Sequence, residues 1–216
     1  MSANFHYAAY SYLDEWMSKD REFHSVLGFE EADKIGHDKG SKTLVDVATY
    51  YRVIRTLKVQ SEPVRLQAAY KALSTIKKPS PQEVVGTVCD FATELKNTGY
   101  GGVALSAASK FLWMRFRDPI KIYDSLTAAY LADGRGFDYK TYESFYDAWQ
   151  SNYQPNEEEI RAACEELINI KKFTLAAEIE DKELAEWTGS KWFLERVFDH
   201  YMQCDALNSG ARSSAA

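Results

Sequence analysis

The sequence has few of the residues from which disulfides and metal centres are built. Among its 216 residues there are three cysteines and four histidines. Cys89, Cys164 and Cys204 are widely spaced, odd in number and form no Cys-x-x-Cys pair, which predicts free, buried thiols in a reducing compartment. Because no two histidines have the spacing of metal ligands, we expect neither a metal site nor a cofactor.

Long apolar runs are also lacking. No stretch of about 18 consecutive apolar residues occurs, so we expect no membrane span and no membrane partner. The segment Met1–Trp16 does not begin with basic residues followed by an apolar run, as a signal peptide would. These two absences together predict a cytoplasmic protein.

Basic residues are fewer than acidic ones overall, but they are concentrated in one part of the chain. The formal net charge is −6, which argues against indiscriminate binding to nucleic acid. Between residues 51 and 80 there is one acid, Glu62, and the bases are Arg52, Arg55, Lys58, Arg65, Lys71, Lys77 and Lys78. Between residues 157 and 186 there are ten acids and four bases. Ordinary solvated faces produce such asymmetry, but it also leaves room for a phosphate-binding surface in the first two-thirds and for a protein partner on the acidic C-terminal third.

Helical periodicity dominates the sequence and predicts an all-α fold. Hydrophobic residues make up 45% and aromatic residues 14% of the chain, which is enough for a large core. We expect a compact helical bundle, either as one unit or as two lobes around a cleft. It would form a single domain over residues 1–207, followed by a small, polar, disordered tail over 208–216. The helices are expected at 5–17, 41–57, 62–76, 80–96, 103–117, 125–131, 138 or 141 to 153, from 156 onward, and 190–204.

Three local patterns add detail to this prediction. Ser80-Pro81-Gln82-Glu83 has the Ser, Pro and Glu of a capping box and predicts that a helix starts at Ser80. The glycine-bounded segment Gly36–Gly40 is expected to be a loop. Arg196 and Asp199 stand three residues apart on the last predicted helix, so we expect them to form a structural ion pair.

The most informative stretch runs from Gly99 to Leu131. Gly99, Gly101 and Gly102 predict a turn that allows positive φ and the close approach of another backbone. The helix after it begins with small residues, among them Ser106 and Ser109, and its free N–H groups would face an anion such as phosphate. A plain turn before a helix is the alternative interpretation.

Lys110 and Asp124 are the candidate chemical groups of this stretch. Lys110 precedes four large apolar residues, so its helix is expected to be central, and partial desolvation favours the neutral amine that acts as a nucleophile. A structural lysine whose head pairs with a carboxylate is the alternative. Asp124 follows a turn that contains Pro119 and stands at the start of the next helix, where a carboxylate is often only a cap.

The order of these features resembles a known family. A glycine-rich hairpin, a small-residue helix with Lys110, a turn with Pro119 and then Asp124 is similar to the core of helix-hairpin-helix DNA glycosylases, within them the 8-oxoguanine glycosylase group. Residues 109–113 (SKFLW) and 122–125 (IYDS) resemble bacterial glycosylase-like proteins in particular. The likeness covers about residues 80–131, with a closing helix within 185–204. Residues 98–102 (TGYGG) replace the family's apolar-Pro-Gly-apolar-Gly hairpin.

The resemblance implies a DNA base glycosylase, with or without AP-lyase activity, that flips a damaged or modified base out of the stack. Asp124 would stabilise the sugar cation, and Lys110 would attack the sugar carbon. DNA would be held through the phosphate backbone. The residues implied for DNA contact are Gly99, Gly101, Gly102, Ser106, Ser109, Arg115 and Arg117, and those implied for the base pocket are Trp113, Tyr123 and Trp192.

Two other interpretations remain open. In the first, the chain has the glycosylase fold but no catalytic activity, and it serves as a helical DNA- or protein-binding module, for example in phage defence or in regulation. A Ser-Lys hydrolase using Lys110 with Ser106 or Ser109 is disfavoured, because the spacing does not match Ser-x-x-Lys.

Overall fold

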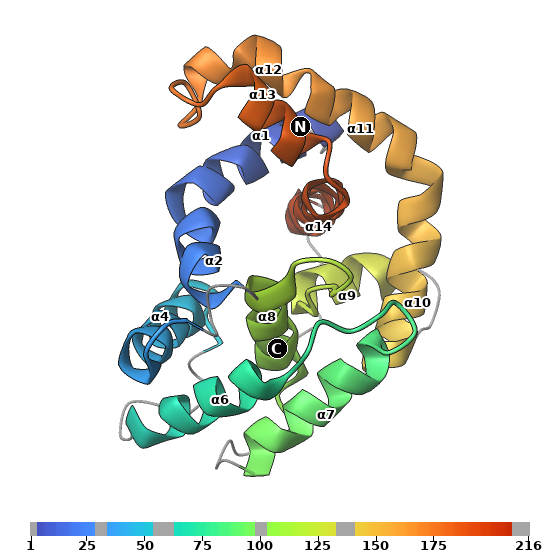
Figure 1. Ribbon diagram of the computed structural model, residues 1–216. Coiled ribbons are helices and arrows are strands. Elements are labelled where there is room, and N and C mark those ends of the chain that lie inside the picture. The colour runs from blue at the N-terminus through green and yellow to red at the C-terminus, as the bar shows by residue number, and fades with distance from the viewer. Residues whose placement is uncertain (1–3, 29–33, 54–62, 98–102, 133–140, 209–216) are drawn as a thin grey trace. The chain divides into compact units, whose positions relative to one another are not determined.

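The computed structural model describes residues 4–28, 34–53, 63–97, 103–132 and 141–208 (Figure 1). Within these ranges the chain forms helices joined by turns and contains no strand, so the predicted all-α fold is confirmed. The chain divides into two compact units, which we call unit 1 (residues 1–20 and 124–216) and unit 2 (residues 21–123). The single domain over residues 1–207 stays a prediction.

Unit 2 is built around a helix that is buried along almost its whole length. Every residue of α8 from Ala107 to Phe116 is buried, so this helix has no solvent-facing side. It packs against α2, α4 and α7, and α6 packs against both α4 and α7. The helices of unit 2 are α2 (Arg21–Leu27), α4 (His37–Tyr50), α6 (Pro63–Thr75), α7 (Val84–Asn97) and α8 (Leu105–Phe116).

The predicted loop Gly36–Gly40 is wrong, because α4 begins at His37 and Gly36 is its N-cap. Gly40 instead serves helix packing: a Cβ at this position would lie 2.0 Å from Cζ of Tyr70 on α6. Only a residue without a side chain lets the buried Tyr70 ring approach the α4 backbone this closely.

The predicted end of the same helix, residue 57, is also wrong. The helix ends at Tyr50 and is closed by two hydrogen bonds, from Val53 N to Ala48 O (2.9 Å) and from Arg52 N to Thr49 O (3.1 Å). This is the Schellman pattern, which needs a left-handed residue, and here Arg52 adopts it with φ 54° in place of the usual glycine.

Unit 1 has α14 as its central helix. Its buried residues lie on all sides of its first turns, and α14 packs against α1, α9, α11 and α13. The α-helices of unit 1 are α1 (Phe5–Glu15), α9 (Ser125–Ala132), α10 (Tyr142–Tyr153), α11 (Glu157–Glu165), α12 (Leu167–Ile170), α13 (Asp181–Thr188) and α14 (Lys191–Asn208). A π-helical turn, η1 (Trp16–Asp20), continues α1, and two 3-10 turns, η3 (Gln154–Asn156) and η4 (Lys171–Phe173), flank α11 and α12.

The capping box at Ser80 forms, but the helix starts later than predicted. Both the backbone N–H and the hydroxyl of Ser80 donate to the Glu83 carboxylate, at 2.8 and 2.7 Å. These two bonds lower the pKa of Glu83. Residues 81–83 are nevertheless a turn, and α7 begins at Val84. The predicted tail 209–216 lies outside the described residues, and Asn208 still belongs to α14.

Candidate functional site

Three polar residues lie on one face of α8, and two of them hold the backbone of Tyr123. Ser106, Ser109 and Lys110 are spaced i, i+3 and i+4, which brings them to the same side of a helix. The Ser109 hydroxyl accepts a hydrogen bond from Tyr123 N at 2.9 Å, and the Lys110 ammonium donates to Tyr123 O at 3.4 Å. Lys110 also donates to the Ser106 hydroxyl at 2.8 Å. The predicted lysine is therefore joined through hydrogen bonds to the residue that directly precedes Asp124.

Burial limits what these side chains can contact from outside. Lys110 is 2% exposed and Ser109 is fully buried, whereas Ser106 is half-buried. The Ser109 hydroxyl also donates to Ser106 O at 3.3 Å. A phosphate contact through Ser109 would require this hydroxyl to leave both backbone partners.

Asp124 belongs to unit 1, in which it stands just before α9. Its carboxylate accepts a hydrogen bond from Leu126 N at 2.9 Å, and its carbonyl accepts one from Ala128 N at 2.8 Å. Asp124 thus caps α9, as one of its two sequence interpretations supposed. The Asp124 residue is half-buried, so part of its surface is accessible to solvent.

Arg115, a predicted DNA contact, is bound to the C-terminal end of α6. Its guanidinium donates to Ile76 O at 3.3 Å and to Ser74 O at 3.1 Å, and the residue is 2% exposed. A cation at this position satisfies carbonyls that the end of a helix leaves without intrahelical donors. A phosphate contact would require the guanidinium to leave those carbonyls.

Arg117, the other predicted arginine, is half-buried and ends α8 in an unusual backbone conformation. It has φ 58° and ψ −106°, and a cis peptide bond joins the next two residues, Asp118 and Pro119. A residue other than glycine at positive φ destabilises the backbone by about 1–3 kcal/mol, and such strain is often found at functional sites. The positive charge of Arg117 also acts on His24, whose Nδ1 donates to Met114 O at 2.9 Å. Burial of His24, followed by the charge of Arg117, lowers the pKa of His24 to about 4.

The three aromatic residues predicted for a base pocket are divided between the units. Trp113 is 1% exposed and belongs to unit 2, as does the half-buried Tyr123. Trp192 belongs to unit 1, where its ring lies 4.5 Å from that of Trp16 and 5.5 Å from that of Phe193. Gly99, Gly101 and Gly102 lie outside the described residues.

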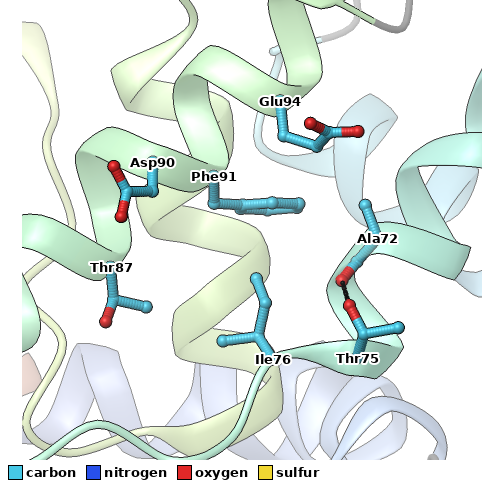
Figure 2. Close-up of a pocket in the computed structure, with 7 residues that line it drawn as sticks. All are labelled: Ala72, Thr75, Ile76, Thr87, Asp90, Phe91 and Glu94. Atoms are coloured by element: carbon cyan, nitrogen blue, oxygen red, sulfur yellow. Dashed lines mark hydrogen bonds between the residues drawn. The ribbon is translucent and has the colours of Figure 1, made fainter.

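A pocket that the sequence did not indicate lies between α6 and α7 in unit 2 (Figure 2). Its volume is about 460 Å³, within the range of small-molecule sites. Phe91 lies across the middle of the pocket, facing Ala72 and Ile76, and the carboxyl groups of Asp90 and Glu94 lie on either side of that ring. Thr75 and Thr87 complete the described lining, which contains none of the predicted site residues. The spacing of Thr87, Asp90 and Glu94 marks one helix face in the sequence, but nothing there indicates that α6 lies opposite.

Unit 1 contains a buried ionic cluster on α14, which confirms the predicted pair of Arg196 and Asp199. The guanidinium and carboxylate are 3.0 Å apart, and both residues are 2% exposed. Asp199 also accepts a hydrogen bond from Trp149 Nε1 at 2.7 Å. Glu15 on α1 joins the cluster, 2.9 Å from His200 and 3.8 Å from Arg196.

Two features are absent from the described residues, a metal-binding group and a membrane-spanning helix. No group of three or more His, Cys, Asp or Glu residues suited to a metal ion occurs there. None of the described helices is both long and apolar enough to cross a bilayer. Comparison of the whole chain with family models, with curated proteins and with solved structures found no match to any of the three.

Proposed function

We propose that this chain is a DNA base glycosylase in which Asp124 and Lys110 carry the chemistry. The observation that supports it is the hydrogen bonding of Tyr123 to Ser109 and Lys110, because this fixes the chain at the residue before Asp124. The order of the glycine-rich segment, α8, the Pro119 turn and Asp124 is the pattern that resembles the helix-hairpin-helix glycosylases. An all-α chain is the fold class that this resemblance requires.

The proposed chemistry needs one carboxylate and one amine. As the bond from the sugar to the base breaks, the base leaves with the electron pair and the sugar develops positive charge, which the Asp124 carboxylate stabilises. The Lys110 ammonium gives one proton to solvent, and the free amine bonds to the sugar carbon and releases a second proton to solvent. Opening of the sugar ring, whose oxygen takes up a proton, then gives a Schiff base. This adduct contains a C=N bond that borohydride reduces to a stable amine.

Phosphate binding would use the start of α8. The N-cap of this 12-residue helix is Ala104, which makes no side-chain cap bond, so its side chain does not occupy the N–H groups of the first turn. The half-buried Arg117 is the predicted arginine with the better access to a phosphate group.

A second candidate function is a helical module that binds DNA without catalysis. It is favoured by the 2% exposure of Lys110 and by the hydrogen bonds from its ammonium to Ser106 and Tyr123. In this alternative Lys110 stabilises unit 2, and Asp124 serves only as the cap of α9.

Borohydride trapping separates the two functions. The protein is incubated with duplex and single-stranded oligonucleotides that carry 8-oxoguanine, uracil, alkylated bases or an abasic site, and alkali-revealed nicking is measured in parallel. We expect a trapped adduct that is lost in Lys110→Ala, and nicking that is lost in Asp124→Asn. Lys121→Ala is the matched control, because Lys121 is 1% exposed and lies in the same unit.

The variants must fold for these results to be informative, so far-UV circular dichroism and thermal unfolding accompany each assay. Nicking without an adduct, lost in Asp124→Asn but kept in Lys110→Ala, would limit the proposal to a one-step glycosylase. Tight DNA binding with neither adduct nor nicking on any substrate would overturn catalysis and select the second candidate.

A further inference from the structure

Unit 1 exposes a cluster of large apolar side chains on one short segment. Eight large hydrophobic residues are exposed in the described part of the chain, and four of them fall between residues 168 and 175. Ile168 is 36% and Ile170 38% exposed on α12, Phe173 is 72% exposed in η4, and Leu175 follows at 59%. We call these four residues the apolar patch. Single exposed apolar residues are ordinary, but a cluster of this kind is typical of an interaction surface.

The backbone under the patch is held in place by side chains. Lys171 donates to Ile179 O at 2.6 Å and pairs with Asp181. Thr174 donates to Lys171 O and accepts from Ala176 N, at 2.8 and 3.0 Å. The patch is therefore presented on an ordered turn, so that a ligand would not have to order the segment on binding.

A hydrogen bond to a residue far away in the sequence also holds this turn in place. Leu175 N donates to the Asp14 carboxylate on α1 at 3.0 Å, and the next residue, Ala176, is fully buried. The backbone on either side of the Leu175 side chain is thus fixed to unit 1, and the side chain itself points to solvent with 59% of its surface exposed.

The size of the patch suits the apolar face of a helix. Residues 168–173 lie in helical and 3-10 turns and extend about 9 Å, at about 1.5 Å per residue, and Leu175 stands in the turn that follows. A bound helix would cover this length with about two turns, using apolar residues at i, i+3 or i+4, and i+7.

The charges around the patch distinguish a protein from a lipid surface. Glu165 and Glu166 precede the patch and Glu178 and Glu180 follow it, and all four are exposed. Between them Lys171 pairs with Asp181, and Lys172 keeps its charge with its ammonium 4.9 Å from the centre of the Phe173 ring. The four exposed glutamates thus outnumber the two lysines. Peripheral membrane segments carry Lys and Arg beside their apolar face, whereas acids here would repel an anionic bilayer.

We propose that the apolar patch binds a basic amphipathic helix of a protein partner. The apolar face of that helix covers Ile168, Ile170, Phe173 and Leu175, and its Lys and Arg residues face the four glutamates. Burial of the Phe173 and Leu175 side chains supplies most of the affinity, because apolar side chains at the centre of an interface dominate binding. The glutamates supply the preference for a basic ligand and a faster association at low salt.

The test uses a fluorescent peptide of about 18 residues, with leucine at helical spacing and lysine elsewhere. Its anisotropy is measured with the full chain at low salt. We expect the double variant Phe173→Ser/Leu175→Ser to bind at least about tenfold more weakly, which corresponds to about 1.4 kcal/mol. Tyr7→Ser is the matched control, because Tyr7 is also in unit 1 and is 59% exposed. Its affinity should equal that of the unmodified chain.

A second peptide replaces every lysine with glutamate and keeps the leucines. We expect it to bind at least about tenfold more weakly than the lysine peptide, and Glu178→Lys/Glu180→Lys to weaken only the lysine peptide. Equal binding of the lysine peptide by the double serine variant would overturn the proposal. Two other results would also overturn it. If the chain binds phosphatidylserine vesicles and the double serine variant does not, the occupant is a lipid surface. If the chain self-associates in analytical ultracentrifugation and the double serine variant does not, the occupant is a second copy.

Discussion

The two central helices, α8 in unit 2 and α14 in unit 1, both bury charged side chains, and the partners described for those side chains differ. On α14, Arg196 contacts the carboxylate of Asp199 at 3.0 Å, and Glu15 approaches both Arg196 and His200. On α8, Arg115 donates to the carbonyls of Ser74 and Ile76, and Lys110 donates to a hydroxyl and a carbonyl. In unit 1 the partners of the buried Arg196 include carboxylates, whereas in unit 2 backbone carbonyls and a hydroxyl are among the partners of Arg115 and Lys110.

This difference bears on the free energy that is lost when each contact is removed. A buried charge that is paired with an opposite charge is costly to disturb, because the remaining partner stays buried and charged. A cation held by carbonyl and hydroxyl oxygens can exchange them for a stronger acceptor, such as a phosphate or a carboxylate, with a smaller loss. We therefore expect the contacts of Arg115 with the backbone carbonyls of Ser74 and Ile76 to be less costly to remove than the pair of Arg196 and Asp199.

Removing Asp199 should have the largest effect. Asp199→Ala leaves the buried Arg196 guanidinium without its closest carboxylate and Trp149 Nε1 without its acceptor. We expect a loss of about 3–5 kcal/mol in the free energy of unfolding, measured by urea denaturation. Replacing both Arg196 and Asp199 with leucine should cost less than Asp199→Ala alone. An equal loss in the single and double variants would show that packing, not the unpaired charge, sets the cost.

Mild acid should weaken unit 2 through His24. The pKa of His24 is lowered from 6.5 to about 4 by burial and by Arg117, so the unfolded state binds its proton first as the pH falls. Stability from this group is present above pH 6.5 and is lost between pH 6.5 and 4, which amounts to about 2 kcal/mol between pH 7.5 and 5.

The measurement is hydrogen exchange of α2 and α8 across this pH range, with the rates corrected for the intrinsic effect of pH. His24→Gln keeps a donor for Met114 O but does not titrate, so its pH dependence should be smaller by the same amount. If the two chains lose protection in parallel, other groups cause the acid sensitivity.

Arg115→Met should have an intermediate effect. Methionine fills much of the space of the arginine stem but leaves the carbonyls of Ser74 and Ile76 without this donor. We expect a loss of about 1–3 kcal/mol in the free energy of unfolding, smaller than for Asp199→Ala. Arg161→Met is the control, because Arg161 forms an exposed pair with Glu157 that should contribute less than about 1 kcal/mol. A loss for Arg115→Met as large as that for Asp199→Ala would remove the contrast between the units.

The elements that sequence periodicity identified are those governed by local interactions. The predicted helices 103–117 and 125–131 agree closely with α8 and α9, because apolar spacing and the breaks at Asp118-Pro119 act within a few residues. The end of α4 was missed because Arg52 takes the left-handed position that glycine usually marks. The start of α4 was missed because Gly40 serves contact with Tyr70, thirty residues away in the sequence.

The candidate site was predictable in its residues but not in its contacts. The spacing of Ser106, Ser109 and Lys110 places them on one helix face. The Tyr123 backbone, which bonds to Ser109 and Lys110, reaches that face only because of how the chain turns after α8. The carbonyls of Ser74 and Ile76, which bind Arg115, lie about forty residues earlier in the sequence, at the end of α6 and just after it. The apolar patch was missed because residues 167–175 mix apolar with polar side chains, and only the fold determines that Leu167 is buried while Phe173 is exposed.

The smallest effect, and the finest comparison of the two units, is expected from the thiols. Cys89 is half-buried in unit 2, and Cys164 is buried in unit 1, where burial raises the pKa of its thiol to about 12. Because the thiolate is the reactive form, a maleimide at pH 8 should modify Cys89 well before Cys164, with no change in stability. With rising urea, Cys164 should become reactive only when unit 1 unfolds, so mass spectrometry of the two labelled sites reports on each unit separately. Simultaneous onset of labelling at both sites would mean that the two units unfold as one cooperative structure, and the differences between α8 and α14 would then not separate their stabilities.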